Sequence, residues 1–251
     1  MPTALITGAT AGLGAAFARR LAADGFSLVL VARDARRLAE SAETLKLAYG
    51  VAVETLPADL ATDEGLRRVE ARVGDGVDLL VNNAGFGHPT PFLQTPVEEE
   101  VKMLKVHCEA VLRLTLTAVP VLLRRGRGGV INVASVAAFF NRGTYSASKA
   151  WVVNFSESVA AEIRNPRVKV MALCPGFVRT EFHRRAGMDM SGTPEPLWLD
   201  ADEVARVAMR DLARGVTVSV PGLLYKAIVA VGTLVPKSVQ HAVNARLSRR
   251  Q

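Results

Sequence analysis

The sequence predicts an α/β protein with a doubly wound, parallel sheet of seven strands in a single domain. Short apolar runs alternate with helical patterns along most of the 251 residues, the order expected of parallel strands joined by helical crossovers. Most of these runs are apolar at every position, as in strands that helices cover on both faces. A glycine-rich turn directly follows the first run, and the chain is 49% apolar, enough for a large core.

The first strand and the first helix frame the glycine turn. Residues Thr3–Thr7 form the strand, and the helix carries Leu13, Phe17 and Leu21 at intervals of four. The turn between them, residues 7–14, reads TGATAGLG. Its glycines let the backbone approach a pyrophosphate, and the helix N-terminus offers free N–H groups. An ordinary connection between a strand and a helix can look the same, so the context must decide.

Further strands and helices complete the predicted sheet. The strands are expected at Ser27–Ala32, Val51–Leu56, Val77–Val81, Val130–Val133, Val168–Cys174 and Val216–Val220. The helices are expected at about 35–49, 63–73, 96–125, 145–164 and 201–214. Asp34 is the expected N-cap of the first of these helices, and Asp200 with Glu203 forms a capping box for the last. Pro120 is expected to kink the 96–125 helix or to end it early.

Chemically active side chains gather at the carboxyl ends of the strands. The residues at these ends are Gly8, Arg33, Asp59, Asn82, Ser135 and Pro175. Ligands of doubly wound sheets bind outside this edge. The sequence therefore places the functional site there.

An arginine directly follows the second strand. In nucleotide-binding folds an acidic residue at this point bonds the ribose 2′-hydroxyl, whereas an arginine accommodates a 2′-phosphate. Arg33 therefore favours NADP(H) over NAD(H). The alternative is a solvated arginine at a helix start.

Ser135, Tyr145 and Lys149 form the predicted catalytic set. Tyr145 and Lys149 lie four apart in a helical pattern, which places them on one face. An adjacent ammonium lowers the pKa of a phenol, whose ordinary value is about 10. Such a phenol can exchange a proton with an alcohol or carbonyl oxygen, and the Ser135 hydroxyl can hydrogen-bond the same oxygen.

Taken in order, these motifs make the chain resemble the short-chain dehydrogenase/reductase family, NADP type, over about residues 2–220. The motifs are TGxxxGxG at 7–14, NNAG at 82–85, the serine at 135, YxxxK at 145–149, and PG followed by a threonine at 175–180. The resemblance implies a Rossmann-like fold and hydride transfer between NADP(H) and a carbonyl or secondary alcohol. It makes Tyr145 the general acid/base, Ser135 the residue that positions the substrate oxygen, and Lys149 the residue that lowers the phenol pKa and bonds the nicotinamide ribose.

The same resemblance implies a cofactor-binding set along the strand ends. Asp59 is expected at the adenine, Asn83 beside the nucleotide and Thr180 at the carboxamide. The full set is Gly8, Thr10, Gly12, Leu13, Gly14, Arg33, Asp59, Leu60, Asn83, Ala84, Tyr145, Lys149, Pro175, Gly176, Val178 and Thr180. No metal ion is expected.

The chain departs from the family at two points. His107 stands where the family has an asparagine whose backbone carbonyl serves a proton-relay water. The relay is expected to survive the change, and the imidazole either adds a second pH dependence or has no role. Ser135 and Tyr145 are ten residues apart, a shorter connection than is usual for the family, which indicates a tight turn at 141–143.

The expected domain organisation is a catalytic domain at 1–221 and a basic helical extension at 222–251. Residues 181–199 lose periodicity and are expected to form a mobile lid, in which His183 and Met188 either touch substrate or are plain loop residues. The net charge of +7 belongs mostly to the tail, because no Asp or Glu follows Asp211. The apolar stretch 223–235 is shorter than the roughly 17 residues that span a bilayer. It packs on the body or on a partner subunit, or it lies at a membrane surface.

Composition bounds the setting and the partners. No basic, apolar leader is visible and Cys108 and Cys174 are isolated, which favours a reducing cytoplasm with buried thiols. The two long helices form either a self-complementary face, giving a homodimer or homotetramer, or plain core packing. A hydrophobic small-molecule substrate is expected and nucleic acid is not. The alternatives to an oxidoreductase are a non-catalytic nucleotide-sensing or scaffold protein and isomerase or dehydratase chemistry on the same fold.

Overall fold

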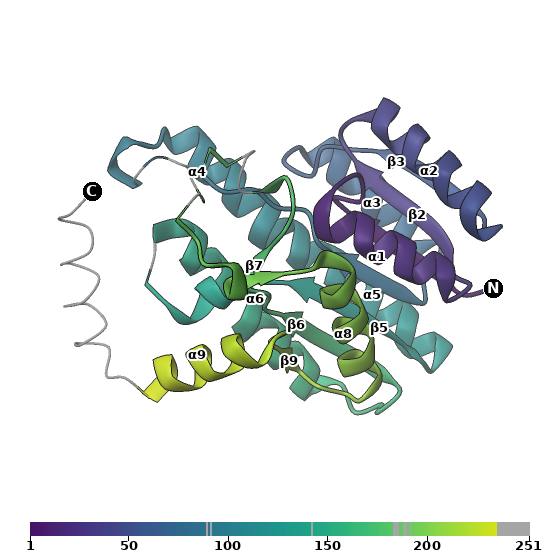
Figure 1. The fold of residues 1–251 in the computed structure, drawn as a ribbon. Coiled ribbons are helices and arrows are strands. Elements are labelled where there is room, and N and C mark those ends of the chain that lie inside the picture. Colours follow the sequence, from purple (N-terminus) through teal and green to yellow (C-terminus); the bar gives the residue numbers. More distant parts are fainter. Residues whose placement is uncertain are drawn as a thin grey trace.

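A seven-stranded parallel sheet forms the centre of the molecule in the computed structural model, which describes residues 1–88, 90, 92–141, 143–182, 186–187, 190 and 192–234 (Figure 1). The strands are β1 (Thr3–Thr7), β2 (Ser27–Ala32), β3 (Val53–Pro57), β4 (Leu79–Asn82), β5 (Gly128–Val133), β6 (Val168–Leu173) and β9 (Val218–Ser219). Their spatial order is β3-β2-β1-β4-β5-β6-β9, and all neighbours pair in parallel. The order reverses between β1 and β4, which is where such sheets bind ligands. The predicted fold class is confirmed.

Helices cover both faces of the sheet. They are α1 (Gly12–Ala23), α2 (Ala35–Tyr49), α3 (Asp63–Gly74), α4 (Val97–Leu104), α5 (Ala110–Arg125), α6 (Gly143–Glu162), α8 (Ala201–Ala213) and α9 (Leu223–Leu234). One core cluster joins α1, α2 and α8 to one face, and a second joins α3 and α5 to the other. Alternate residues of β1 serve the two clusters, since Ile6 faces the first and Leu5 the second.

Side-chain caps fix where three of the helices begin. Asp34 accepts from the Arg37 N–H at the start of α2, and Asp200 accepts from the Glu203 N–H at the start of α8. Both caps were expected, and each satisfies a backbone donor that the helix cannot pair internally. Thr62 caps α3 in the same way.

The predicted helix over 96–125 is interrupted, although not at its proline. Residues Lys105–Glu109 form a π-helical segment between α4 and α5, and Pro120 lies inside α5 without ending it. Among the described residues, Val97–Arg125 is also the helical stretch that is long and apolar enough to cross a membrane. Half of its most apolar window is buried in the fold, as in a core helix.

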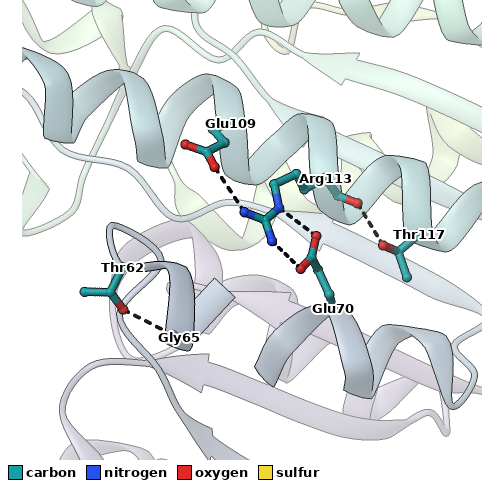
Figure 2. A network of polar contacts seen from close by, with 6 residues as sticks. All are labelled: Thr62, Gly65, Glu70, Glu109, Arg113 and Thr117. Carbon is teal, nitrogen blue, oxygen red and sulfur yellow. Dashed lines mark hydrogen bonds and ion pairs between the residues drawn. The ribbon is translucent and has the colours of Figure 1, made fainter. Parts of the chain in front are cut away.

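Arg113 of α5 connects its own helix to α3 and to the π-helical segment through hydrogen bonds (Figure 2). Its guanidinium donates to both carboxylate oxygens of Glu70 on α3, at 2.7 and 2.6 Å, and to Glu109 at 3.1 Å. The bidentate geometry makes this contact more directional than a surface ion pair made by lysine. The network lies beside the segment that carries His107.

A small second sheet joins the two ends of the expected lid, and its two strands are called the lid root below. Strands β7 (Phe177–Val178) and β8 (Trp198–Leu199) pair in parallel and flank residues 179–197. Two-residue strands leave no periodic pattern, so they could not be predicted from the sequence. His183 and Met188 lie outside the described residues, as does Arg142 of the expected tight turn.

Helix α9 packs on the body through one buried residue, Tyr225, which is 4% exposed. Leu223, Leu224 and Val231 on the same helix are exposed. Tyr225 thus contacts the domain, while most of the helix is open to solvent. Residues after 234 lie outside the described part of the chain.

Candidate active site

The glycine turn is held in place by Thr7 and Asn83. The Asn83 Nδ2 donates to the carbonyls of Thr7 and Gly8, at 2.9 and 3.2 Å. The Thr7 hydroxyl accepts from the N–H groups of Asn83 and Ala84, at 2.9 and 3.0 Å. The chain after β4 is thereby tied to the turn after β1 at the point where the strand order reverses.

The turn has the shape of a dinucleotide cradle. Gly8 has φ +67°, a conformation that favours glycine, and a Cβ on Gly14 would collide with the Gly8 carbonyl oxygen. A Cβ on Gly12 would meet Thr180 at 3.0 Å. Ala11 caps α1 with no side-chain hydrogen bond, so the N–H groups of this helix can serve an anionic group. These features fit a pyrophosphate.

Two arginines lie near the end of β2. Arg33 is exposed directly after the strand, as expected. Arg37, which the sequence analysis did not single out, places Nη2 3.4 Å from the Thr10 carbonyl and 3.5 Å from a carboxylate oxygen of Glu181. It therefore joins the glycine turn to the start of the lid. The sequence signal that could have identified Arg37 is its position in the first turn of α2, shortly after the end of β2.

Several residues of the predicted cofactor set contribute backbone rather than side chain. Leu13 and Leu60 are buried in the core, so their side chains do not face the cleft edge. Val178 is buried too. The Asp59 carboxylate accepts from the Ala61 N–H at 2.9 Å and shapes its own turn.

Other members of the predicted set lie in the turns that follow the strands. Pro175 accepts from the Val136 N–H at 3.0 Å, which links the turn after β6 to the turn that carries Ser135. Gly176 lies beneath the ring of Tyr225, and Thr180 contacts the glycine turn at Gly12. Asn82 is buried and donates to Asn132 at 2.9 Å, so it joins β4 to β5 instead of facing a ligand.

The structure brings Ser135, Tyr145 and Lys149 together. The Ser135 side chain lies next to the Tyr145 hydroxyl and lowers its pKa, and the Ser135 Oγ accepts from the Ala137 N–H at 3.1 Å. The Lys149 Nζ lies 5.8 Å from the centre of the Tyr145 ring and donates to the Val133 carbonyl at 2.9 Å. Lys149 is 5% exposed, so its charge is almost fully removed from water.

Burial controls the protonation of this set. It raises the pKa of Tyr145 to about 12, although the hydrogen bond from Ser135 opposes the shift. The expectation of a lowered phenol pKa is therefore wrong for this structure, because desolvation outweighs the opposing effect of Ser135. Burial also lowers the pKa of Lys149 to about 8. Near neutral pH the phenol is a proton donor.

His107 is a buried, neutral link between two parts of the site. It lies in the π-helical segment, and its Nε2 accepts from the Phe86 N–H at 3.1 Å. This assigns the ring hydrogen to Nδ1, which donates to the Ser148 hydroxyl at 3.0 Å; that hydroxyl donates to the Tyr145 carbonyl at 2.7 Å. Burial and then the charge of Lys149 hold the pKa of His107 well below its ordinary value. The second pH dependence considered for it is therefore not expected near neutral pH.

Aromatic rings enclose the phenol of Tyr145. Tyr145 lies 5.6 Å from His107 and 6.1 Å from Phe182 between ring centres, and Phe86 lies 5.8 Å from His107. Phe86 and Phe182 were not predicted as site residues. Both follow motif residues closely, Gly85 and Thr180, and that proximity was the signal. The wall suits an apolar group next to the reacting oxygen.

Comparison with known proteins agrees with this geometry. Residues 2–190 match the family model described as short chain dehydrogenase, and the chain belongs to that family.

Relatives and solved structures extend the likeness. A very-long-chain 3-oxoacyl-CoA reductase of Pyrenophora tritici-repentis is 36% identical over 187 residues, 70% of this chain and 55% of the relative. The 3-oxoacyl-[acyl-carrier-protein] reductase FabG of Aquifex aeolicus is 30% identical over 70% of this chain and 74% of its own. A short-chain dehydrogenase from Sphingobium yanoikuyae in complex with NADPH superposes with a TM-score of 0.85 at 33% identity, covering 99% and 96% of the two chains. The chain spans about half the length of the very-long-chain relatives.

Proposed function

We propose that this chain is an NADP(H)-dependent oxidoreductase that interconverts a carbonyl compound and a secondary alcohol, with Tyr145 as general acid/base. The proximity of the Ser135 side chain to the Tyr145 hydroxyl, with the Lys149 Nζ 5.8 Å from the Tyr145 ring centre, carries the proposal. They lie at the ligand-binding edge of the sheet, next to a glycine cradle that fits a dinucleotide. The bound nicotinamide would supply or accept the hydride.

Each residue has a distinct task in this proposal. In reduction, the protonated phenol of Tyr145 donates its proton to the substrate oxygen as negative charge develops there. The Ser135 hydroxyl donates a second hydrogen bond to that oxygen and holds it against the phenol. The ammonium of Lys149 stabilises the phenolate that forms and would bond a ribose hydroxyl of the nucleotide. Thr180, against Gly12, would hold the carboxamide.

The turnover experiment uses the intact chain with NADPH and a panel of carbonyl compounds, followed at the NADPH absorbance band. Wild type is expected to oxidise NADPH, and Tyr145→Phe is expected to bind it equally well but to lose about 10²–10⁴-fold in kcat, the range associated with general acid–base catalysis. Tyr49→Phe, an exposed tyrosine on α2, is the matched control. Retained turnover in Tyr145→Phe contradicts the assigned role. Saturable binding without turnover on any compound would favour the nucleotide-sensing alternative.

Arg33 and Arg37 support NADP(H) as the cofactor. Both lie where a 2′-phosphate would stand beyond β2, and Arg37 is already oriented over the glycine turn. Arg37→Met is expected to weaken NADPH binding about tenfold more than NADH binding, the loss of about one charge-assisted hydrogen bond. Arg36→Met is the control, because Arg36 is exposed and pairs only with Glu40 at 3.7 Å. Equal losses for both nucleotides would oppose the assignment.

The proposed substrate class is a hydrophobic carbonyl compound of the 3-oxoacyl thioester type. The aromatic rings around Tyr145 support an apolar group beside the carbonyl, and the 3-oxoacyl reductases among the relatives support the thioester class. Medium and long 3-oxoacyl thioesters are expected to give higher kcat/KM than a sugar ketone of similar size. The opposite ranking would overturn the assignment of class.

Assembly and location are also proposed from surface features. Leu104, Leu112, Leu116 and Trp151 are exposed on α4, α5 and α6, which supports a homodimer or homotetramer through these helices. Sedimentation of wild type and of Leu116→Glu tests this, with dissociation expected for the variant.

We place the enzyme in the cytoplasm with peripheral membrane contact through α9, whose exposed Leu223, Leu224 and Val231 precede the basic tail. Co-flotation with anionic liposomes is expected, and should be lost in Leu223→Ser/Val231→Ser. Equal flotation of the variant would exclude α9 as the contact.

A further inference from the structure

Helix α9 reaches the root of the lid through the hydroxyl of Tyr225. This hydroxyl accepts from the Phe177 N–H at 3.0 Å and donates to the Leu197 carbonyl at 2.7 Å. Phe177 belongs to β7, and Leu197 directly precedes β8. One side chain from the C-terminal extension therefore connects the backbone before residue 179 to the backbone at Leu197.

The ring of Tyr225 is as closely fitted as its hydroxyl. A Cβ on Gly176 would overlap the Tyr225 ring, so the glycine of the PG motif leaves the space that the ring fills. Gly222, with φ +87°, turns the chain so that α9 starts beside Leu199 of β8; a Cβ there would meet Leu199 at 3.1 Å. Tyr225 is 4% exposed in an otherwise largely exposed helix.

The far end of α9 touches the opposite side of the site. A Cβ on Gly232 would lie 2.9 Å from Phe140, which follows the 3₁₀ turn Val136–Phe139 between Ser135 and Tyr145. In Figure 1, α9 runs in yellow below this region, beyond the sheet edge at β9. The helix thus contacts both the lid root and the turn that carries the catalytic serine.

The lid root carries residues that face the catalytic phenol and the cradle. The Phe182 ring lies 6.1 Å from the Tyr145 ring, and Thr180 packs against Gly12. Glu181 pairs with Arg37 at 3.5 Å. Any shift of β7 and β8 would move these three residues relative to Tyr145.

We propose that Tyr225 is a positioning residue that holds β7 and the start of β8 together and so fixes Thr180 and Phe182 relative to Tyr145, so that α9 selects substrates by size without touching the reacting atoms. This inference rests on the proposed oxidoreductase function. Its physical basis is that one hydroxyl bonds two backbone groups, the Phe177 N–H in β7 and the Leu197 carbonyl just before β8. Removing that hydroxyl leaves the ring in place but lets the backbone at Phe177 and at Leu197 move apart.

Two variants and one control test the proposal on the full chain. Tyr225→Phe keeps the ring on Gly176 and removes both hydrogen bonds, Tyr225→Ala removes both features, and Tyr49→Phe is the control. Amide hydrogen exchange of peptides within 179–197 is expected to accelerate about tenfold in Tyr225→Phe, the loss of about one net hydrogen bond, and further in Tyr225→Ala. Exchange in α1 and β1 is expected to stay at the wild-type rate.

Kinetics separate positioning from general destabilisation. In Tyr225→Phe, KM for a long 3-oxoacyl thioester is expected to rise about tenfold while kcat stays within about twofold. The affinity for NADPH alone is expected to be unchanged. Unchanged exchange in Tyr225→Phe overturns the proposal, as does an equal loss of kcat and NADPH affinity. If no panel compound is turned over, the proposed function fails, while exchange and NADPH affinity still decide whether Tyr225 fixes the lid root.

Discussion

The Ser135 side chain lies beside the Tyr145 phenol and lowers its pKa, although only ten residues separate the two in the chain. The short connection forms the 3₁₀ turn Val136–Phe139, and α6 then begins at Gly143, whose φ is +67°. The Ser146 hydroxyl donates to the carbonyls of Ala137 and Phe140 and holds this turn closed. The shortened spacing therefore leaves Ser135 in the catalytic set.

Ser135→Ala is expected to shift the pH profile as well as to lower activity. The Ser135 hydrogen bond lowers the pKa of Tyr145, which burial has raised to about 12, so its removal raises that pKa further. Alcohol oxidation needs the phenolate as base, so its alkaline limb should move to higher pH. Carbonyl reduction, which uses the protonated phenol, should show no such shift near neutral pH. Rates measured from pH 6 to 11 in both directions check this, and an unmoved alkaline limb would separate Ser135 from the phenol.

Lys149→Met is expected to stabilise the fold while it abolishes turnover. Burial lowers the pKa of Lys149 to about 8 from its ordinary value of about 10.5, so at pH 7 the folded chain holds a buried ammonium. Replacing it with an apolar side chain should add roughly 1–3 kcal/mol to the free energy of unfolding at pH 7.

The sign of the pH dependence follows from proton binding. Between about pH 8 and 10 the unfolded chain binds the lysine proton more fully than the folded chain, so wild-type stability rises with pH over this window. The difference in free energy of unfolding between Lys149→Met and wild type should therefore narrow from pH 7 to pH 10 in urea titrations. Lys46→Met, at an exposed site on α2, should change stability by less than about 0.5 kcal/mol. A variant less stable than wild type at pH 7 would contradict the argument.

The sequence predicted that Ser135, Tyr145 and Lys149 lie close together, but it did not predict their environment. Strands β1 and β2 were predicted to the residue, because a glycine turn and Arg33 mark where they end. The π-helical segment was missed because one extra residue per turn barely alters an apolar stripe. The phenol pKa was predicted with the wrong sign, since the enclosure of Tyr145 by Phe182 and His107 arises from segments far apart in the chain. The contact of Tyr225 with the lid root has the same origin.

The two nitrogens of His107 can be tested separately. His107→Gln keeps an acceptor near Nε2 for the Phe86 N–H, whereas His107→Asn keeps a donor near Nδ1 for Ser148. Because a buried donor without a partner costs about 1–3 kcal/mol, we expect His107→Asn to be less stable than His107→Gln by that order. Urea titration and amide exchange at Phe86 measure this. Equal stability of the two variants would show that the Phe86 bond has little weight.

Gly14→Ala tests whether the cradle requires close backbone contact. A Cβ at this position would collide with the Gly8 carbonyl oxygen and would lie 2.6 Å from the Asn83 Nδ2, and neither backbone nor anchored amide can move freely. The turn must therefore shift, which separates the N–H groups of α1 from the position a pyrophosphate would take. We expect at least a hundredfold loss of NADPH affinity, measured by titration of nucleotide fluorescence. Gly74→Ala is the matched control, since a Cβ there meets its nearest neighbour, Thr117, at 4.0 Å. Its NADPH affinity should equal that of wild type, and an equal affinity in Gly14→Ala would mean that the nucleotide does not use this turn.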